Sequence, residues 1–338
     1  MQRATRTGAT TGDGVDGTTT RTWPAPAGQV RTSFWLLAGA AMLCGAAAQE
    51  GWWPALASPV VTGAVAVMLI GGLPHGACDL SLAAGALRLG SRDLALVLVL
   101  YLAVAAAMAL LWVVAPVAAL VLFLGLAGVH FGEDWTMLPP GLLRAMAGMA
   151  VIATAALGQP TQVAALFTAM TGSGLGVPIA RWAAAAAPVT GLVTLVGLML
   201  AWRDGHCRWV VAQVVSYAGL LVLPPLLGFC VFFAGLHAPL HWHTVMHRLQ
   251  HRNPALVRAE GGALTTLTLA VWLVALMTGG RWMHLASGGL PLGAEAFRLL
   301  SIVAAPHLAL SLAIDRRLAR DSAQAAPGFA PIAKPGAP

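Results

Sequence analysis

The sequence predicts an all-α protein, a polytopic integral membrane bundle of about eight to ten transmembrane helices. Of its 338 residues, 58% are hydrophobic and only 9% are charged, with a mean hydropathy of +0.78. A soluble domain carries about 25% charged residues, so the chain is too apolar for a soluble fold. The apolar residues also fall into ten runs that approach the roughly 20 residues a helix needs to cross a bilayer.

The predicted spans end where glycine, proline or charged residues interrupt these apolar runs. They cover residues 33–49, 56–73, 93–114, 117–131, 141–157, 186–202, 209–224, 226–248, 263–279 and 294–314. Residues 161–185 are broken by the stretch 171–174, which predicts a re-entrant segment or a surface helix. Residues 74–89 are apolar but short, and they are predicted to form half a helix inside the protein.

The arginines between the spans set the predicted orientation. They concentrate in alternate loops, at Arg88, Arg92, Arg144, Arg203, Arg208, Arg248, Arg252 and Arg258. Both tails are basic as well, so we expect both termini in the cytoplasm and a multi-pass protein of the inner (cytoplasmic) membrane. The net charge of +7 is scattered over tails and short loops, which predicts no nucleic-acid partner.

The chain divides into three predicted parts. Residues 1–32 are rich in Gly, Thr and Arg and are expected to be a disordered tail, and residues 316–338 a second disordered tail. Residues 33–315 form the transmembrane domain between them. The four cysteines are far apart and form no CxxC pair, so neither a disulfide framework nor a zinc knuckle is predicted.

The stretch Leu236–His251 holds five of the ten histidines and continues an apolar span. Ionisable side chains inside a membrane-length apolar segment are costly, and they mark a functional site by default. His237 and His241 stand four residues apart, so they share one face of a helix and are predicted metal ligands. Pro239 between them predicts a kink beside the site. The other histidines of the stretch are expected among lipid headgroups, and their role stays open: His243, His247 and His251.

Two further histidines are each followed four residues later by an aspartate. His75 follows Gly71-Gly72-Leu73-Pro74, which should break the second span, and precedes Asp79; His130 ends the fourth apolar run and precedes Asp134. A ligating histidine usually donates its other ring N–H to a carboxylate or carbonyl. The spacing therefore predicts two pairs of a ligand and its supporting carboxylate, each on one helical turn. Glu133 is either part of this group or a solvated loop residue.

His307 lies in the middle of the last span without a partner nearby in the sequence. It is either a further site residue or a histidine that packs between helices. Four neutral imidazoles suit iron, copper or zinc. Iron is favoured, because four histidines on Fe(II) leave positions for O2 and substrate, whereas catalytic zinc typically keeps three protein ligands and water. A metal so deep in an apolar bundle implies a substrate that dissolves in lipid.

Several short motifs resemble the Brp/Blh family of membrane β-carotene 15,15′-dioxygenases. They are the string from Gly72 to Asp79 (GLPHGACD), the string from His130 to Asp134 (HFGED), His237-x3-His241 and the late Pro306-His307. Their order and rough spacing agree from about residue 33 to 315. The resemblance implies an all-helical membrane enzyme that binds one Fe(II) through histidines and cleaves the central double bond of β-carotene with O2 to give two all-trans-retinal. The transmembrane domain would then be catalytic.

Carried over to this chain, the resemblance assigns individual roles. The implied iron ligands are His75, His130, His237 and His241, and the implied supporting residues are Asp79, Asp134 and His307. Aromatic residues around the central span are candidates for contact with a polyene, namely Phe229, Phe233 and Trp242. The implied partners are a carotenoid, O2 and the lipid bilayer, with a functional link to a microbial rhodopsin.

Two other functions fit parts of the pattern. A di-iron lipid hydroxylase, ketolase or desaturase would need about eight histidines and HxxHH boxes, and the chain has no HxxHH string. A non-catalytic metal or haem carrier, or an assembly factor for a rhodopsin, would need no bound substrate. Metal stoichiometry separates these alternatives.

Overall fold

The computed structural model describes residues 30–49, 58–87, 89–279 and 289–325. Within these ranges every regular element is a helix, which confirms the all-α prediction. The predicted N-terminal tail, residues 1–32, lies almost entirely outside the described residues. The last helix continues to Ala325, so the predicted start of the C-terminal tail at residue 316 is wrong by most of three turns. The helix persists there because the Ala- and Arg-rich stretch 316–325 has good helix formers and neither Gly nor Pro.

Each of the ten predicted spans contains at least one helix. The first half of the chain forms α1 (Thr32–Gln49), α2 (Ser58–Gly72), α3 (Pro74–Ala77), α4 (Asp79–Ala86), α5 (Ser91–Val114), α6 (Pro116–Gly132), α7 (Leu142–Gly158), α8 (Pro160–Thr171) and α9 (Gly176–Ala185). The second half forms α10 (Ala187–Arg203), α11 (Cys207–Val222), α12 (Pro225–Cys230), the π-helix η1 (Val231–His237), α13 (Ala238–Arg248), α14 (Pro254–Thr278) and α16 (Gly289–Ala325).

Four of the described helices are long and apolar enough to cross a membrane by themselves: Ser91–Val114, Pro225–Arg248, Pro254–Thr278 and Leu290–Ile314. Two bent pairs raise this number to six if each pair is one span: α7 with α8, bent by 112°, and α9 with α10, bent by 44°. The sharp bend before α8 agrees with the predicted re-entrant or surface segment. Four shorter apolar helices, α1, α2, α6 and α11, match further predicted spans, and the predicted total of eight to ten requires that they cross as well.

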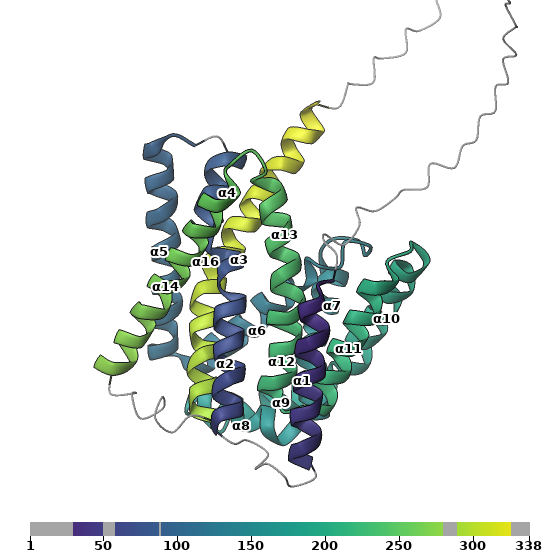
Figure 1. Cartoon of the computed structure of the whole chain (residues 1–338). Coiled ribbons are helices and arrows are strands. Elements are labelled where there is room, and N and C mark those ends of the chain that lie inside the picture. Colours follow the sequence, from purple (N-terminus) through teal and green to yellow (C-terminus); the bar gives the residue numbers. More distant parts are fainter. Residues whose placement is uncertain (1–29, 50–57, 88, 280–288, 326–338) are drawn as a thin grey trace, which may run out of the picture.

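The connections that carry arginine gather at one end of the bundle. In Figure 1 the links between α4 and α5, between α10 and α11 and between α13 and α14 all point upward. The start of α1 and the end of α16 lie at the same end, as expected if both termini share one side of the membrane.

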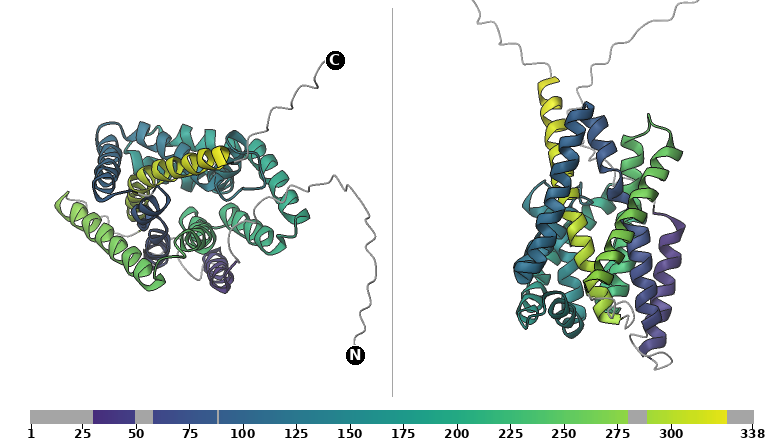
Figure 2. Two further views of the ribbon diagram at one scale, coloured as in Figure 1. Left: turned by 90° about the horizontal axis from the view of Figure 1, so that it is seen from above. Right: turned by 90° about the vertical axis from the view of Figure 1, so that its left-hand side faces the viewer.

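The central span, α12–η1–α13, packs against α1, α2 and α11, and in Figure 2 it is seen end-on inside the bundle. The irregularity expected at Pro239 takes the form of the π-helix that precedes it. Pro239 has no N–H to donate to the carbonyl of Gly235, and the N–H of Ala238 bonds to the carbonyl of Phe233, five residues back. This wider turn rotates His237 relative to α13, and it sits at the candidate site, as π-bulges often do.

Glycines let α6 and α7 pack backbone against backbone. A Cβ on Gly148 would overlap the carbonyl oxygen of Gly128 and the N–H of Gly132, and a Cβ on Gly132 would overlap the carbonyl of Arg144. Small residues at such positions are the usual means of close helix contact in a bilayer, where apolar side chains gain little from leaving lipid. The contact fixes the end of α6, where His130 and Asp134 lie.

The first testable prediction concerns this contact. Gly148→Ala should lower the thermal unfolding midpoint of the detergent-purified protein, because overpacking costs about 1–3 kcal/mol. Gly125→Ala on α6 is the matched control, since a Cβ there meets nothing within 4 Å. Equal midpoints for the two variants would contradict the close contact.

Candidate active site

Four histidines from four separate elements meet in the interior of the bundle. His130 lies on α6, His237 on η1, His241 on α13 and His307 on α16. The ring centroid of His130 is 4.7 Å from that of His237, 5.6 Å from that of His241 and 5.0 Å from that of His307. His130, His237 and His307 are buried, and His241 is partly buried. We call these four residues the histidine cluster.

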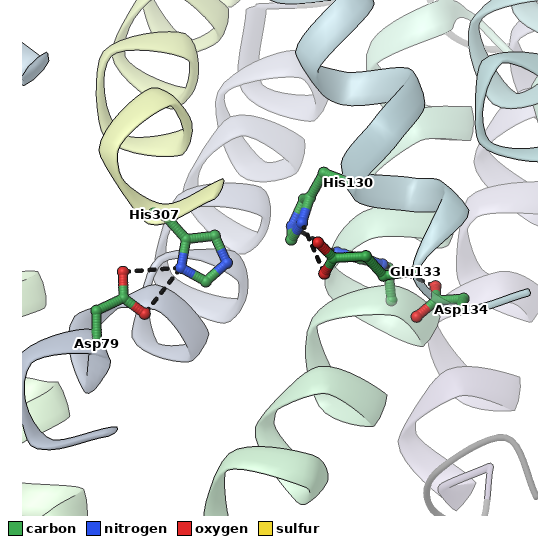
Figure 3. Close-up of polar contacts among 6 residues, drawn as sticks. Asp79, His130, Glu133, Asp134 and His307 are labelled. Atoms are coloured by element: carbon green, nitrogen blue, oxygen red, sulfur yellow. Dashed lines mark hydrogen bonds and ion pairs between the residues drawn. The ribbon is translucent and has the colours of Figure 1, made fainter. Parts of the chain in front are cut away.

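Two members of the histidine cluster are held by aspartates, of which Asp79 is buried and Asp134 partly buried. The Nδ1 atom of His237 is 2.8 Å from Oδ2 of Asp134, and the Nδ1 atom of His307 is 2.8 Å from both carboxylate oxygens of Asp79 (Figure 3). A carboxylate accepts hydrogen bonds, so it favours the tautomer in which Nδ1 carries the proton. The Nε2 atom of each ring then keeps its lone pair, which is the state that a metal ligand requires.

Both aspartates contact histidines that are far from them in the sequence, and the predicted pairing of His130 with Asp134 was wrong. Asp134 contacts His237 instead of His130, because α6 ends at Gly132 and Asp134 lies in the turn that follows. Asp79 contacts His307, and it is not on one helical turn with His75, because α3 ends at Ala77 and a new helix begins at Asp79. A spacing of four residues brings side chains together only on a continuous helix.

His130 occupies the centre of the cluster and has its own carboxylate. Its Nδ1 atom is 3.4 Å from Oε2 of Glu133, which follows it by three residues, so Glu133 belongs to the site and is not a solvated loop residue. Its Nε2 atom is 3.0 Å from Nε2 of His237. At metal–nitrogen distances of about 2.1 Å, two nitrogens on neighbouring corners of an octahedron are also about 3 Å apart.

The residue types of the cluster are those that bind a divalent metal. Imidazoles whose Nδ1 atoms face carboxylates are the donors that iron, copper and zinc use in proteins. As the described side chains stand, no three or more of the His, Cys, Asp and Glu groups converge tightly enough to enclose an ion. Of the predicted ligands, the backbone of His75 lies in α3, but its side chain is outside the described part of the chain.

Tyr101 extends one of the histidine–aspartate pairs, and sequence reasoning missed it. Its hydroxyl on α5 donates to Oδ2 of Asp79 at 3.0 Å, so Tyr101, Asp79 and His307 form a chain of hydrogen bonds across three helices. The available signal was composition: the protein has only two tyrosines, and this one lies in the middle of a largely aliphatic span.

An apolar cavity opens beside the histidine cluster. Its walls include His130, His307 and Gly76 together with aromatic and aliphatic side chains. Phe229 and Phe233, both predicted substrate contacts, line it and stack on each other with ring centroids 5.2 Å apart. We call this space the first pocket. Mostly apolar walls with a few polar groups are typical of a small-molecule site.

Two corrections concern the aromatic residues. Trp242 does not line the first pocket, because α13 turns its ring toward α14, where it lies against Gly261 and Cys78 in a separate apolar cluster. Phe131 was not predicted, yet it lines the first pocket, and its ring centroid is 5.0 Å from that of His237. The histidines with an open role, His243, His247 and His251, are exposed.

Comparison with known proteins identifies the chain's relatives. A family model described as "Beta-carotene 15,15'-dioxygenase" matches residues 65–315, which include every residue of the histidine cluster. The chain belongs to this family. A relative named "Beta-carotene 15,15'-dioxygenase", from uncultured marine bacterium 66A03, is 26% identical over 269 residues, covering 73% of this chain and 91% of the relative. No solved structure matches the chain.

The second prediction tests the chain of hydrogen bonds at Asp79. Tyr101→Phe should lower the free energy of unfolding by about 1 kcal/mol, and Asp79→Asn by more, because a buried hydrogen bond to a charged group is lost. In the double variant the losses should fall short of their sum, since both residues serve one interaction. The measurement is unfolding in detergent, with Asp93→Asn on the exposed face of α5 as control. Strictly additive losses would contradict the interaction.

Proposed function

We propose that the protein cleaves the central 15,15′ double bond of β-carotene with O2 and releases two molecules of all-trans-retinal in an iron-dependent reaction. Membership of the dioxygenase family supports an oxidoreductase that acts on a carotenoid. The observation that carries the proposal is the position of the histidine cluster on the wall of the first pocket, an apolar space inside the helix bundle. Such a site suits a metal reaction on a substrate that has no polar group to be recognised.

The proposed ligands of Fe(II) are the four residues of the histidine cluster, together with the predicted ligand His75. Sequence reasoning gave His307 a supporting role, but its contact with Asp79 has the same form as the contact of His237 with Asp134. We therefore place His307 among the ligands. When bound, the iron would supply the activation of O2, which no protein side chain can perform alone.

The remaining residues of the site would orient and isolate the reactants. Asp134 and Asp79 hold the rings of His237 and His307 in one tautomer, which presents their Nε2 atoms to the metal. Phe131, Phe229 and Phe233 form apolar walls beside these rings. They would align the polyene and exclude water, so that oxidation of the bound double bond competes with few side reactions. No proton abstraction is needed to open a carbon–carbon double bond with O2.

The membrane supplies the substrate in this proposal. A carotenoid dissolves in the bilayer, and the described helices expose a largely aliphatic surface to it. We place the protein in the inner membrane of the cell, as its arginine distribution predicts. A functional link to a microbial rhodopsin, which would use the retinal, remains part of the proposal.

The third prediction concerns the product. In a bacterium that accumulates β-carotene, expression of the chain should bleach the orange pigment and yield retinal, measured by chromatography of extracts. His237→Ala should abolish retinal formation, whereas His243→Ala, six residues further on and exposed, should leave it within about twofold, the scale of an ordinary surface substitution. An apocarotenal of another length would move the cleaved bond, and unchanged β-carotene beside well-folded protein would refute the activity.

The fourth prediction concerns the metal. The purified protein should carry about one iron per chain, as a single cluster of imidazole ligands implies. Asp134→Asn should weaken iron binding by about 10–100-fold, because the partner that orients His237 is changed. Asp204→Asn, at a surface ion pair with Arg203, is the control.

Elemental analysis after dialysis against a chelator separates the candidate functions. Two irons per chain would indicate the di-iron alternative. A readily exchanged metal with no turnover would indicate a carrier.

A further inference from the structure

A second apolar pocket lies next to the first. It is bounded by α6, α7, α8, α11, α12 and α16. Every side chain on its wall is apolar, among them Ile152 and Ala155 on α7 and Val163 and Met170 on α8. A cavity with no polar partner cannot hold ordered water well, so an apolar occupant is the physically favoured one.

The two pockets share part of their walls. Phe123, Ala127, Phe131 and Phe229 line both of them. The ring centroids of Phe131 and Phe229 are 6.0 Å apart, so flat aromatic side chains form the partition between the two spaces. Aromatic rings offer flat apolar faces, and a flat conjugated chain packs well between them.

The two pockets differ in chemistry. Of the two, only the first includes imidazoles on its wall, those of His130 and His307. The second therefore lies beyond the aromatic partition as seen from the histidine cluster. The chain bends by 112° between α7 and α8, and α8 supplies one wall of the second pocket, including Val163 and Met170.

Arg298 anchors the end of α8. Its guanidinium on α16 pairs with Glu295 at 2.6 Å, and it donates through Nε to the carbonyl of Met170 at 2.8 Å. Met170 is on the pocket wall and stands one residue before the end of α8. The interaction ties the end of α8 to α16, so a charged anchor holds this wall of the second pocket in place.

We propose that the second pocket is the subsite for the ring-bearing end of one half of the carotenoid, with its polyene chain running through the first pocket to the histidine cluster. The inference rests on the proposed function. It adds that the second pocket sets the distance between the end ring of the substrate and the double bond that reacts. The end ring stops against the wall that α8 forms, and the bond that lies beside the cluster follows from the position of that wall.

This subsite should also favour an unsubstituted end ring over a hydroxylated one. A hydroxyl group on the ring would lose its hydrogen bonds to water and find no partner on an entirely apolar wall. Wild-type protein should therefore turn over a carotenoid hydroxylated on both rings with a kcat/KM roughly tenfold or more below that for β-carotene. Equal values would overturn the assignment, and this comparison needs no variant.

The deciding experiment shortens the second pocket. Ala155→Trp fills it from α7, and Leu157→Trp, on the exposed face of the same helix, is the matched control. With Ala155→Trp, kcat/KM for β-carotene should fall at least about tenfold, as when a pocket excludes a group by size. An apocarotenal that is ring-bearing at one end and truncated at the other should lose less than about threefold, because its short end fits the reduced space.

The outcomes separate this inference from the proposed function. Equal losses on both substrates, or no loss, would overturn the subsite while leaving the cleavage activity in place. If the wild type cleaves neither substrate, the proposed function fails, and the subsite is tested by binding alone. Induced circular dichroism of bound β-carotene should then be present in the wild type and Leu157→Trp and lost in Ala155→Trp. Should Ala155→Trp not fold, Ile152→Phe provides a smaller obstruction for the same measurements.

Discussion

The burial of imidazole rings in the apolar interior of the helix bundle is the constraint on which the rest of the structure depends. A polar ring without partners is costly there, so each buried histidine has to be held by a polar group. Asp134 reaches His237 from the turn after α6, and Asp79 reaches His307 from the start of α4. These contacts join segments separated by 103 and 228 residues, and they decide which helices come together at the site.

Irregular backbone places these groups at the right depth. The second span stops at Gly72, a new helix starts at Asp79, and α6 ends two residues before Asp134. Breaks of this kind are tolerated within a membrane only where protein surrounds them. The π-helix at His237 has the same effect on the central span, because a wider turn changes the direction of one side chain without ending the helix. The site residues therefore lie where regular α-helices end or are interrupted.

Hydropathy and residue type predicted the spans and the histidines, because a bilayer requires apolar runs of a given length and penalises every ionisable group inside them. They did not predict the partners. The pairing of His130 with Asp134 assumed a helix that continues, and it ends. Tyr101 and Phe131 lie in ordinary apolar runs, and only tertiary packing brings them to the site. Trp242 is next to His241 in the sequence, but it lies on another face of α13 and packs outside the first pocket.

The division of the interior into a polar wall and an apolar space follows from the same constraint. The carboxylates and imidazoles collect where α4, α6, η1, α13 and α16 meet, because each needs the others to be buried at all. The volume that remains between the helices is lined by phenylalanine and aliphatic side chains, which need no partners. An apolar molecule can enter that volume without displacing a hydrogen bond. A reaction on such a molecule must therefore rely on its position relative to the histidines, and position is what the stacked rings and the anchored end of α8 provide.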